Sequence, residues 1–181
     1  MKLIVAFCKN RGIGFKNKLP WELSGDMNMF KHLTLGKGNN AVIMGRNTWL
    51  SLPFKNRPLP KRENIVLTTK ATDLNFYKLS KTKHNLIVLP SLKEAKTYCE
   101  KNKFDNVWII GGSQVYKESL DSKLIDTIYA TEIDKEYECD TFFPEIKDNF
   151  VLKAVGRVNV ENDVVYNYKK YEKKLYKELS I

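Results

Sequence analysis

One carboxylate on an otherwise apolar helix face is the group in this sequence best suited to chemistry. In and just after residues 19–30, apolar side chains recur at intervals of four, three and three, and they line one side of a predicted helix: Leu23, Met27, Phe30 and Leu33. Asp26 lies three residues after Leu23 and four before Phe30, so its carboxylate is on that same side. An ionised carboxylate there is unfavourable unless it has a partner. Asp26 is therefore a candidate acid; the alternative is that Ser24 or Asp26 only caps the helix start or interacts favourably with its dipole.

Two strand ends carry groups that suit phosphate binding. Residues 44–48 place a glycine before a predicted helix start, together with a guanidinium and a hydroxyl, and residues 110–114 place two glycines before another helix start. Exposed N–H groups at a helix start bind anions, and glycine allows close approach of the backbone. Each segment alone also fits an ordinary turn. Two of them in one small domain favour a dinucleotide, bound without the three-glycine Rossmann fingerprint or the Walker pattern, which the chain lacks.

The remaining reactive residues do not suggest other chemistry. His32 and His84 lie in polar, lysine-containing surroundings, which indicates surface histidines. Cys8 has no evident activating partner, and the cysteines have no metal-ligand spacing. No second acid is placed to form a hydrolytic pair with Asp26. One proton, or one orienting hydrogen bond, fits Asp26 better than hydrolysis.

Apolar runs alternating with helical patterns predict an α/β fold with a mostly parallel sheet. Strands are predicted near residues 3–7, 41–44, 64–69, 86–89, 107–110, 127–133, 150–160 and 164–171. Helices are predicted from the 19–30 stretch to about residue 35, and over 46–50, 91–102 (with a capping box of Ser91 and Glu94) and 113–119. The last two strands have no helix between them and should be antiparallel. We expect a single domain over residues 1–181, with an eight-stranded sheet, one antiparallel C-terminal strand, about four flanking helices and an extension at 175–181.

Composition favours a soluble protein with anionic partners. Of the 181 residues 31 are basic and 21 acidic, which gives a net charge of +10; this suits a nucleotide, a polyanionic substrate or nucleic acid. No basic run accompanies a nucleic-acid recognition motif, and the densest run, 169–174, is interpreted as a solvated strand edge. Three cysteines indicate free thiols in a reducing compartment. With no signal-peptide core or membrane span, we expect a cytoplasmic protein.

Seven motifs, taken together and in order, resemble the dihydrofolate reductase family. They are Gly12-Ile13-Gly14, Leu19-Pro20-Trp21, Asp26 with Phe30, residues 42–49, Arg57-Pro58-Leu59-Pro60, residues 110–116, and Asp140-Thr141-Phe142-Phe143-Pro144. The likeness runs from residue 3 to about residue 174. The insert at 53–57 and the Phe-Phe-Pro ending are similar to eukaryotic-type members, whereas aspartate at position 26 is similar to bacterial and many protist members.

The resemblance implies NADPH-dependent reduction of 7,8-dihydrofolate to 5,6,7,8-tetrahydrofolate by a monomer, with no nucleic-acid or membrane partner. Asp26 would hold the pterin and favour its protonation, Thr131 would hydrogen-bond that carboxylate, and Trp21 would order a nearby water. The implied substrate site comprises Ile4, Val5, Met27, Phe30, Leu52, Arg57, Leu59, Arg62, Ile110 and Tyr116, with Arg62 gripping the glutamate α-carboxylate. Implied cofactor contacts are Ala6, Ile13, Gly14, Leu19, Gly45, Arg46, Asn47, Thr48, Leu67, Thr68, Thr69, Ile110, Gly111, Gly112, Ser113, Gln114, Val115 and Tyr116, with a cis peptide between the two glycines.

Elementary chemistry supports the resemblance. Hydride transfer needs no nucleophile; it needs two flat rings in contact in a dry pocket and a proton for the nitrogen beside the accepting carbon. A buried anion that stabilises the protonated ring supplies a reason for Asp26, and the loop 9–18 would close over the nicotinamide. Thr69 and Pro90 stand where members often carry basic residues for the 2′-phosphate, which leaves Arg46 and Lys70 for that charge.

Two alternatives are weighed against this interpretation. The reductase of riboflavin biosynthesis resembles the same fold and also uses NADPH, but it lacks the arrangement of Trp21, Asp26 and Phe30 and the Arg62 clamp. A nucleic-acid-binding α/β module is the non-enzymatic alternative suggested by the charge. It predicts tight duplex binding that falls steeply with salt.

Overall fold

A computed structural model describes residues 1–70 and 84–174 of the chain. Its main sheet has eight strands in the order β5-β4-β3-β6-β1-β7-β10-β9, and a second, two-stranded sheet joins β2 to β8. The strands are β1 (Lys2–Cys8), β2 (Gly12–Gly14), β3 (Asn40–Gly45), β4 (Glu63–Leu67), β5 (Leu86–Leu89), β6 (Asn106–Ile109), β7 (Thr127–Ile133), β8 (Thr141–Phe142), β9 (Phe150–Glu161) and β10 (Val164–Lys173). The helices are α1 (Ser24–Leu35), α2 (Arg46–Ser51), α4 (Leu92–Asn102) and α5 (Ser113–Asp121), with a 3₁₀ turn at Phe54–Asn56. The predicted extension at 175–181 lies outside the described residues.

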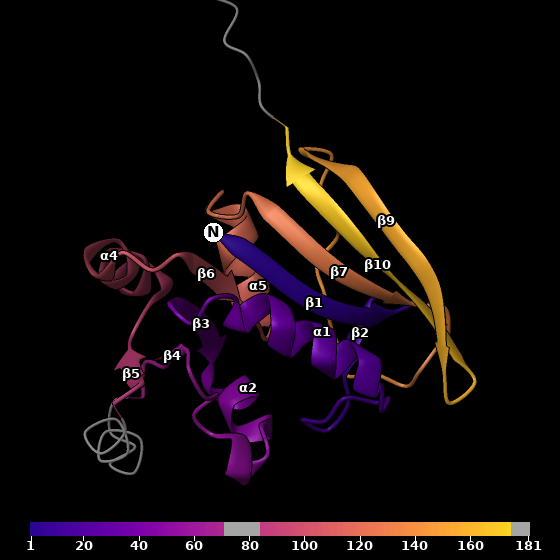
Figure 1. Ribbon diagram of the computed structural model, residues 1–181, viewed down its shortest axis with the longest axis horizontal. Coiled ribbons are helices and arrows are strands. Elements are labelled where there is room, and N and C mark those ends of the chain that lie inside the picture. The colour runs from indigo at the N-terminus through magenta and orange to yellow at the C-terminus, as the bar shows by residue number, and fades with distance from the viewer. Residues whose placement is uncertain (71–83, 175–181) are drawn as a thin grey trace, which may run out of the picture.

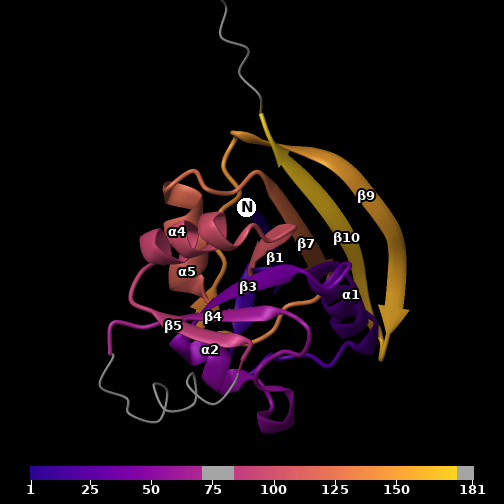
Figure 2. The same cartoon turned by 60° about the vertical axis from the view of Figure 1, so that its left-hand side comes forward.

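Helices cover both faces of the main sheet (Figures 1 and 2). Because side chains alternate along a strand, Leu3 and Val5 pack in one core cluster with residues of α4 and α5. Ile4, between them, packs in a second cluster with Trp49 of α2 and Phe30 of α1. These α/β layers place the carboxyl ends of the parallel strands along one edge, where ligands bind in such sheets.

The expected α/β architecture is confirmed. All neighbouring strands from β5 to β7 pair in parallel, and β10 is antiparallel to both β7 and β9. One half of the predicted capping box at the start of α4 is also present, since the Ser91 side chain accepts a hydrogen bond from the Glu94 N–H at 3.2 Å.

Two local expectations are wrong. The lysine-rich run 169–174 is not a sheet edge, because β10 lies between β7 and β9 and the edge strand is β9. Local sequence pattern does not encode which strand ends up outermost. The start of α1 is not capped by Ser24 or Asp26 either, because Leu23 is the N-cap residue and its side chain accepts nothing. The acceptor comes from Glu161, at the far end of β9.

Candidate active site

A cavity of about 890 Å³ opens along the carboxyl ends of the parallel strands. We call it the main cavity. Its wall takes residues from the ends of β1, β3, β4 and β6, from α1, and from the starts of α2 and α5. This is the position expected for the ligand site of a parallel α/β sheet.

Asp26 is the buried acid of this cavity. Its side chain projects from the first turn of α1, and the residue is 9% exposed. The Thr131 hydroxyl on β7 donates to its Oδ1 at 2.6 Å. Burial raises the pKa of the Asp26 carboxyl; the Thr131 hydrogen bond opposes that rise, and the negative charge of Glu161 adds to it. The predicted contact between Thr131 and Asp26 is therefore present.

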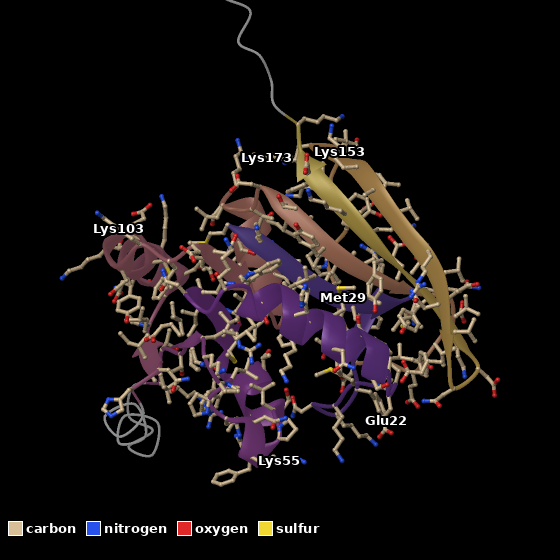
Figure 3. The ribbon with its side chains drawn as sticks, viewed as in Figure 1. Glu22, Met29, Lys55, Lys103, Lys153 and Lys173 are labelled. Atoms are coloured by element: carbon tan, nitrogen blue, oxygen red, sulfur yellow. The ribbon has the colours of Figure 1, made fainter. Side chains whose placement is uncertain are left out.

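The apolar residues on one face of α1 pack partly in the core and partly along the main cavity. Leu23 is buried in a core cluster, with Trp21. Met27 is 49% exposed and lines the main cavity, and Phe30 and Leu33 line it further along the helix. Figure 3 shows α1 with its side chains and labels Met29, which also lines the cavity. An apolar helix face that borders a cavity can pack against a flat ligand as well as against the protein core.

The two glycine-bearing strand ends meet beside the cavity. Gly45 N–H donates to Gly111 O at 2.8 Å, and the predicted cis peptide between Gly111 and Gly112 is present. A Cβ added at Gly112 would lie 3.2 Å from Thr48 Oγ1, which is tighter than ordinary packing. The helices that follow, α2 and α5, have no side-chain cap at their N-termini. Their first N–H groups can therefore donate to phosphate oxygens in the cavity.

The loop that was expected to cover the cavity contributes to its wall. Ile13 and Gly14 lie on β2, which pairs antiparallel with β8, and both residues line the cavity. Asn17, Lys18 and Leu19 line it further along.

Most of the predicted site residues lie on the main cavity. All eighteen predicted cofactor contacts line it, as do Asp26 and Thr131 and the substrate residues Ile4, Val5, Met27, Phe30, Leu52, Ile110 and Tyr116. Four predicted residues are not brought to its wall: Trp21, Arg57, Leu59 and Arg62.

Those four residues are held within the fold. Arg62 is 4% exposed, with its Nε donating to Pro60 O at 3.1 Å and its Nη1 to Thr34 Oγ1 at 2.8 Å. Arg57 Nη1 donates to the Trp49 carbonyl at 3.5 Å. Leu59 is buried. Trp21 is also buried, and its Nε1 has no hydrogen-bond partner among the described residues.

Sequence reasoning missed part of the wall. The missed residues are Met29, Leu33, Ser51, Ser91, Leu92, Glu118, Tyr129, Ala130, Thr141, Ala154, Gly156, Tyr168, Lys169 and Lys170. Leu33 could have been found, because it continues the apolar stripe one turn beyond Phe30. The wall residues on β9 and β10 could not be predicted from the sequence around them, because these strands approach α1 only through the order of strands in the sheet.

The fold and this cavity define an α/β protein with a ligand cavity outside the carboxyl ends of its parallel strands. Comparison with known proteins sharpens that class. A family model described as dihydrofolate reductase matches residues 1–173. The dihydrofolate reductase of Aedes albopictus is 40% identical over 185 residues, which covers 94% of this chain and 96% of that protein. That of Gallus gallus is 39% identical over 184 residues, with 94% of each covered.

A longer relative also matches. The bifunctional dihydrofolate reductase-thymidylate synthase of Daucus carota is 36% identical over 181 residues, which covers 94% of this chain and 33% of that protein. The chain therefore belongs to the dihydrofolate reductase family, whose members are oxidoreductases that reduce dihydrofolate to tetrahydrofolate with a nicotinamide cofactor. No helix within residues 1–70 and 84–174 is long and apolar enough to cross a membrane.

Proposed function

We propose that this chain reduces 7,8-dihydrofolate to 5,6,7,8-tetrahydrofolate with NADPH, and that Asp26 holds the pterin ring. The observation that carries the proposal is one buried carboxylate on the wall of a large cavity, with its Oδ1 hydrogen-bonded by Thr131 at 2.6 Å. A carboxylate has two oxygens that accept paired N–H groups, which matches the amino group and ring nitrogen of a pterin. The second oxygen, Oδ2, has no protein donor among the described residues.

The N-termini of α2 and α5 support the choice of a phosphorylated dinucleotide. Both begin at a glycine without a side-chain cap, and both border the cavity. When bound, NADPH supplies the hydride. The chain supplies N–H donors at Thr48 and Ser113, and positive charge at Arg46 and Lys70 on the rim where the 2′-phosphate would lie.

The chemical role of the chain's own residues is to orient the substrate and to stabilise a proton on it. Asp26, as a buried anion, favours the protonated form of the ring nitrogen beside the carbon that accepts the hydride. Thr131 fixes the orientation of the carboxylate. Met27 and Phe30 cover the ring and exclude water. Trp21 Nε1 is a buried donor with no acceptor in residues 1–70 and 84–174, so it is suited to hold one ordered water.

We further propose a monomer in a reducing compartment such as the cytoplasm, with the reductase as one domain. All three cysteines are free thiols, as expected from the sequence.

The direct test follows NADPH absorbance with dihydrofolate as the second substrate, between about pH 5 and pH 8. We expect oxidation of NADPH that depends on dihydrofolate and saturates with it. NADPH consumption that is independent of dihydrofolate across this range would contradict the proposal. Gel filtration with light scattering, run on the same preparation, checks for the monomer.

A further inference from the structure

Helix α1, which carries Asp26, begins without a cap of its own. The N-cap residue is Leu23, whose extended backbone (φ −128°, ψ 99°) is usual for a cap but whose side chain accepts no hydrogen bond. Ser24, the next residue, uses its hydroxyl as a donor. The free N–H groups of the first turn therefore need an acceptor from elsewhere in the fold.

Glu161 supplies that acceptor from the C-terminal hairpin, 137 residues away. Its Oε1 accepts from both the backbone N–H and the hydroxyl of Ser24, each at 2.6 Å. Its Oε2 accepts from Gly25 N–H at 3.0 Å and from the Tyr166 hydroxyl at 3.4 Å. These hydrogen bonds hold the pKa of the Glu161 carboxyl below its usual range. A negative charge at this point also interacts favourably with the N-terminal end of the helix dipole.

The packing leaves room for this carboxylate because residue 25 is glycine. A Cβ at Gly25 would lie 2.5 Å from the Tyr166 hydroxyl and 3.2 Å from Glu161 Oε2. Figures 1 and 2 agree that the tip of the β9–β10 hairpin lies beside the start of α1, and Figure 3 labels Glu22 at that helix start. A second contact, from Asn162 Nδ2 to the Glu22 carbonyl at 3.2 Å, joins the same two segments.

We propose that Glu161 is a positioning residue for Asp26. It caps α1 from the C-terminal hairpin and so fixes the first helical turn at the place where Asp26 meets Thr131. The inference rests on the proposed function, because the role of Asp26 is assigned there. It adds that two distant elements position the acid: Thr131 on β7 hydrogen-bonds its carboxylate, and Glu161 holds the backbone of the two residues before it.

Of the described ionisable side chains near Asp26, Glu161 is the one whose charge shifts the pKa of Asp26. Tyr116 from α5 and Tyr166 and Tyr168 from β10 all feel the Asp26 charge, but burial raises the pKa of each phenol, so they stay neutral at working pH. Glu161 remains ionised and is the charged side chain that acts on Asp26 within the described residues. Like charges disfavour each other's ionisation. Replacing Glu161 by a neutral residue should therefore lower the pKa of Asp26.

The first test measures this directly in the ligand-free protein. Carboxyl ¹³C shifts are followed against pH in the wild type and in Glu161→Gln, with Asp26→Asn identifying the Asp26 resonance. The matched control is Asp163→Asn, which removes the same charge from the same turn at an exposed residue with φ 58°, a conformation that asparagine tolerates. We expect the Asp26 midpoint to move to lower pH in Glu161→Gln and to stay in place in the control. An unmoved midpoint in Glu161→Gln, or an equal shift in both variants, would overturn the proposal.

A wild-type measurement guards against a variant that fails to fold. If Glu161 caps α1, the amide proton shifts of Ser24 and Gly25 should follow its protonation, with a midpoint below the ordinary glutamate value. If the amide proton shifts of Ser24 and Gly25 do not change as Glu161 is protonated, Glu161 does not cap α1 and the proposal is wrong.

The catalytic test separates this inference from the proposed function. In Glu161→Gln we expect hydride transfer to begin its decline at lower pH than in the wild type, with the KM for NADPH unchanged. A uniform loss at all pH values with an unmoved midpoint would overturn the positioning role. A chain that never oxidises NADPH would remove the proposed function, while the carboxyl titration would still decide whether Glu161 acts on Asp26.

Discussion

The Thr131 hydroxyl and the Asp26 carboxylate are joined by a 2.6 Å hydrogen bond that spans 105 residues of sequence. Thr131 pairs in register with Ala6 in the adjacent parallel strand, so the donor is built into the sheet. Asp26 is carried by a helix that packs on the same sheet. The bond therefore ties the candidate acid to the main sheet, which limits its freedom to rotate away from a ligand.

Thr131→Val should raise the pKa of Asp26. The hydroxyl stabilises the ionised carboxylate, so its removal favours the protonated form. Because a hydrogen bond to a charged group contributes about 1.5–3 kcal/mol, we expect a stability loss in that range at neutral pH. Carboxyl ¹³C titration and urea unfolding measure the two effects. Thr127→Val, on the same strand, is the control and should change neither; an unchanged Asp26 midpoint in Thr131→Val would contradict the assigned hydrogen bond.

Asp26→Asn should impair hydride transfer most at high pH. An amide cannot favour the protonated pterin, so the variant depends on substrate that is already protonated in solution, which is more abundant at low pH. Proton-transfer groups typically contribute about 10²- to 10⁴-fold, and we expect a loss of that order above neutrality that shrinks as the pH falls. Single-turnover rates across the pH range measure it. An equal loss at every pH would show that Asp26 does not serve protonation.

The same substitution should stabilise the ligand-free fold. Burial raises the pKa of Asp26 in the folded state above its value in the unfolded chain. The contribution of Asp26 to the free energy of unfolding is therefore fully present at pH values below the unfolded-state pKa. It is lost as the pH rises through the folded-state pKa. At neutral pH the wild type carries a buried charge, whereas asparagine is neutral and still accepts from Thr131. We expect Asp26→Asn to be more stable by about 1 kcal/mol at pH 7, with the gain shrinking towards about pH 4. Urea unfolding measures it, and a less stable variant at pH 7 would contradict the prediction.

Local pattern was enough to predict the eight strands of the main sheet, the four helices and the two glycine-bearing strand ends beside the cavity. Most other residues of the cavity wall were predicted from the family resemblance. Runs of apolar residues mark most strands of the main sheet, and a glycine at a strand end followed by a helix start marks the N-termini of α2 and α5. In a parallel sheet, strand ends fall on one edge, so residues such as Thr48 and Ser113 meet without any further information.

Contacts that depend on the order of strands in the sheet could not be predicted from the sequence around each residue. Nothing near Glu161 indicates that it accepts from Ser24, because the partner is a helix start 137 residues earlier. The same holds for Tyr168, which reaches the cavity only because β10 lies beside β7. The burial of Arg62 was also missed, since Thr34, its partner, lies on another element 28 residues away.

Arg62→Leu should weaken dihydrofolate binding while leaving NADPH affinity unchanged. Arg62 is buried and does not line the main cavity, but its Nη2 has no partner among the described residues. The proposed clamp therefore requires the substrate carboxylate to reach Nη1 and Nη2 beyond the present cavity wall. Losing one partner of a buried charged pair costs about 2–5 kcal/mol, which sets the expected loss of affinity. Isothermal titration with each ligand measures it. Lys61→Gln, which removes a neighbouring exposed charge, is the control, and equal losses for both ligands would contradict the assigned role.

Lys70→Gln should reduce the preference for NADPH over NADH. Lys70 lies exposed on the cavity rim, its backbone N–H donates to Thr68 Oγ1 at 3.2 Å, and the neighbouring Thr69 brings no charge. An exposed charge pair contributes at most about 1 kcal/mol, so we expect NADPH affinity to fall several-fold and NADH affinity to stay the same. Screening should erase the difference at high salt. Binding of both nucleotides, measured at low and high salt, checks this. Lys101→Gln, on α4 and away from the cavity wall, is the matched control, and an equal loss of NADH affinity in Lys70→Gln would place the 2′-phosphate elsewhere.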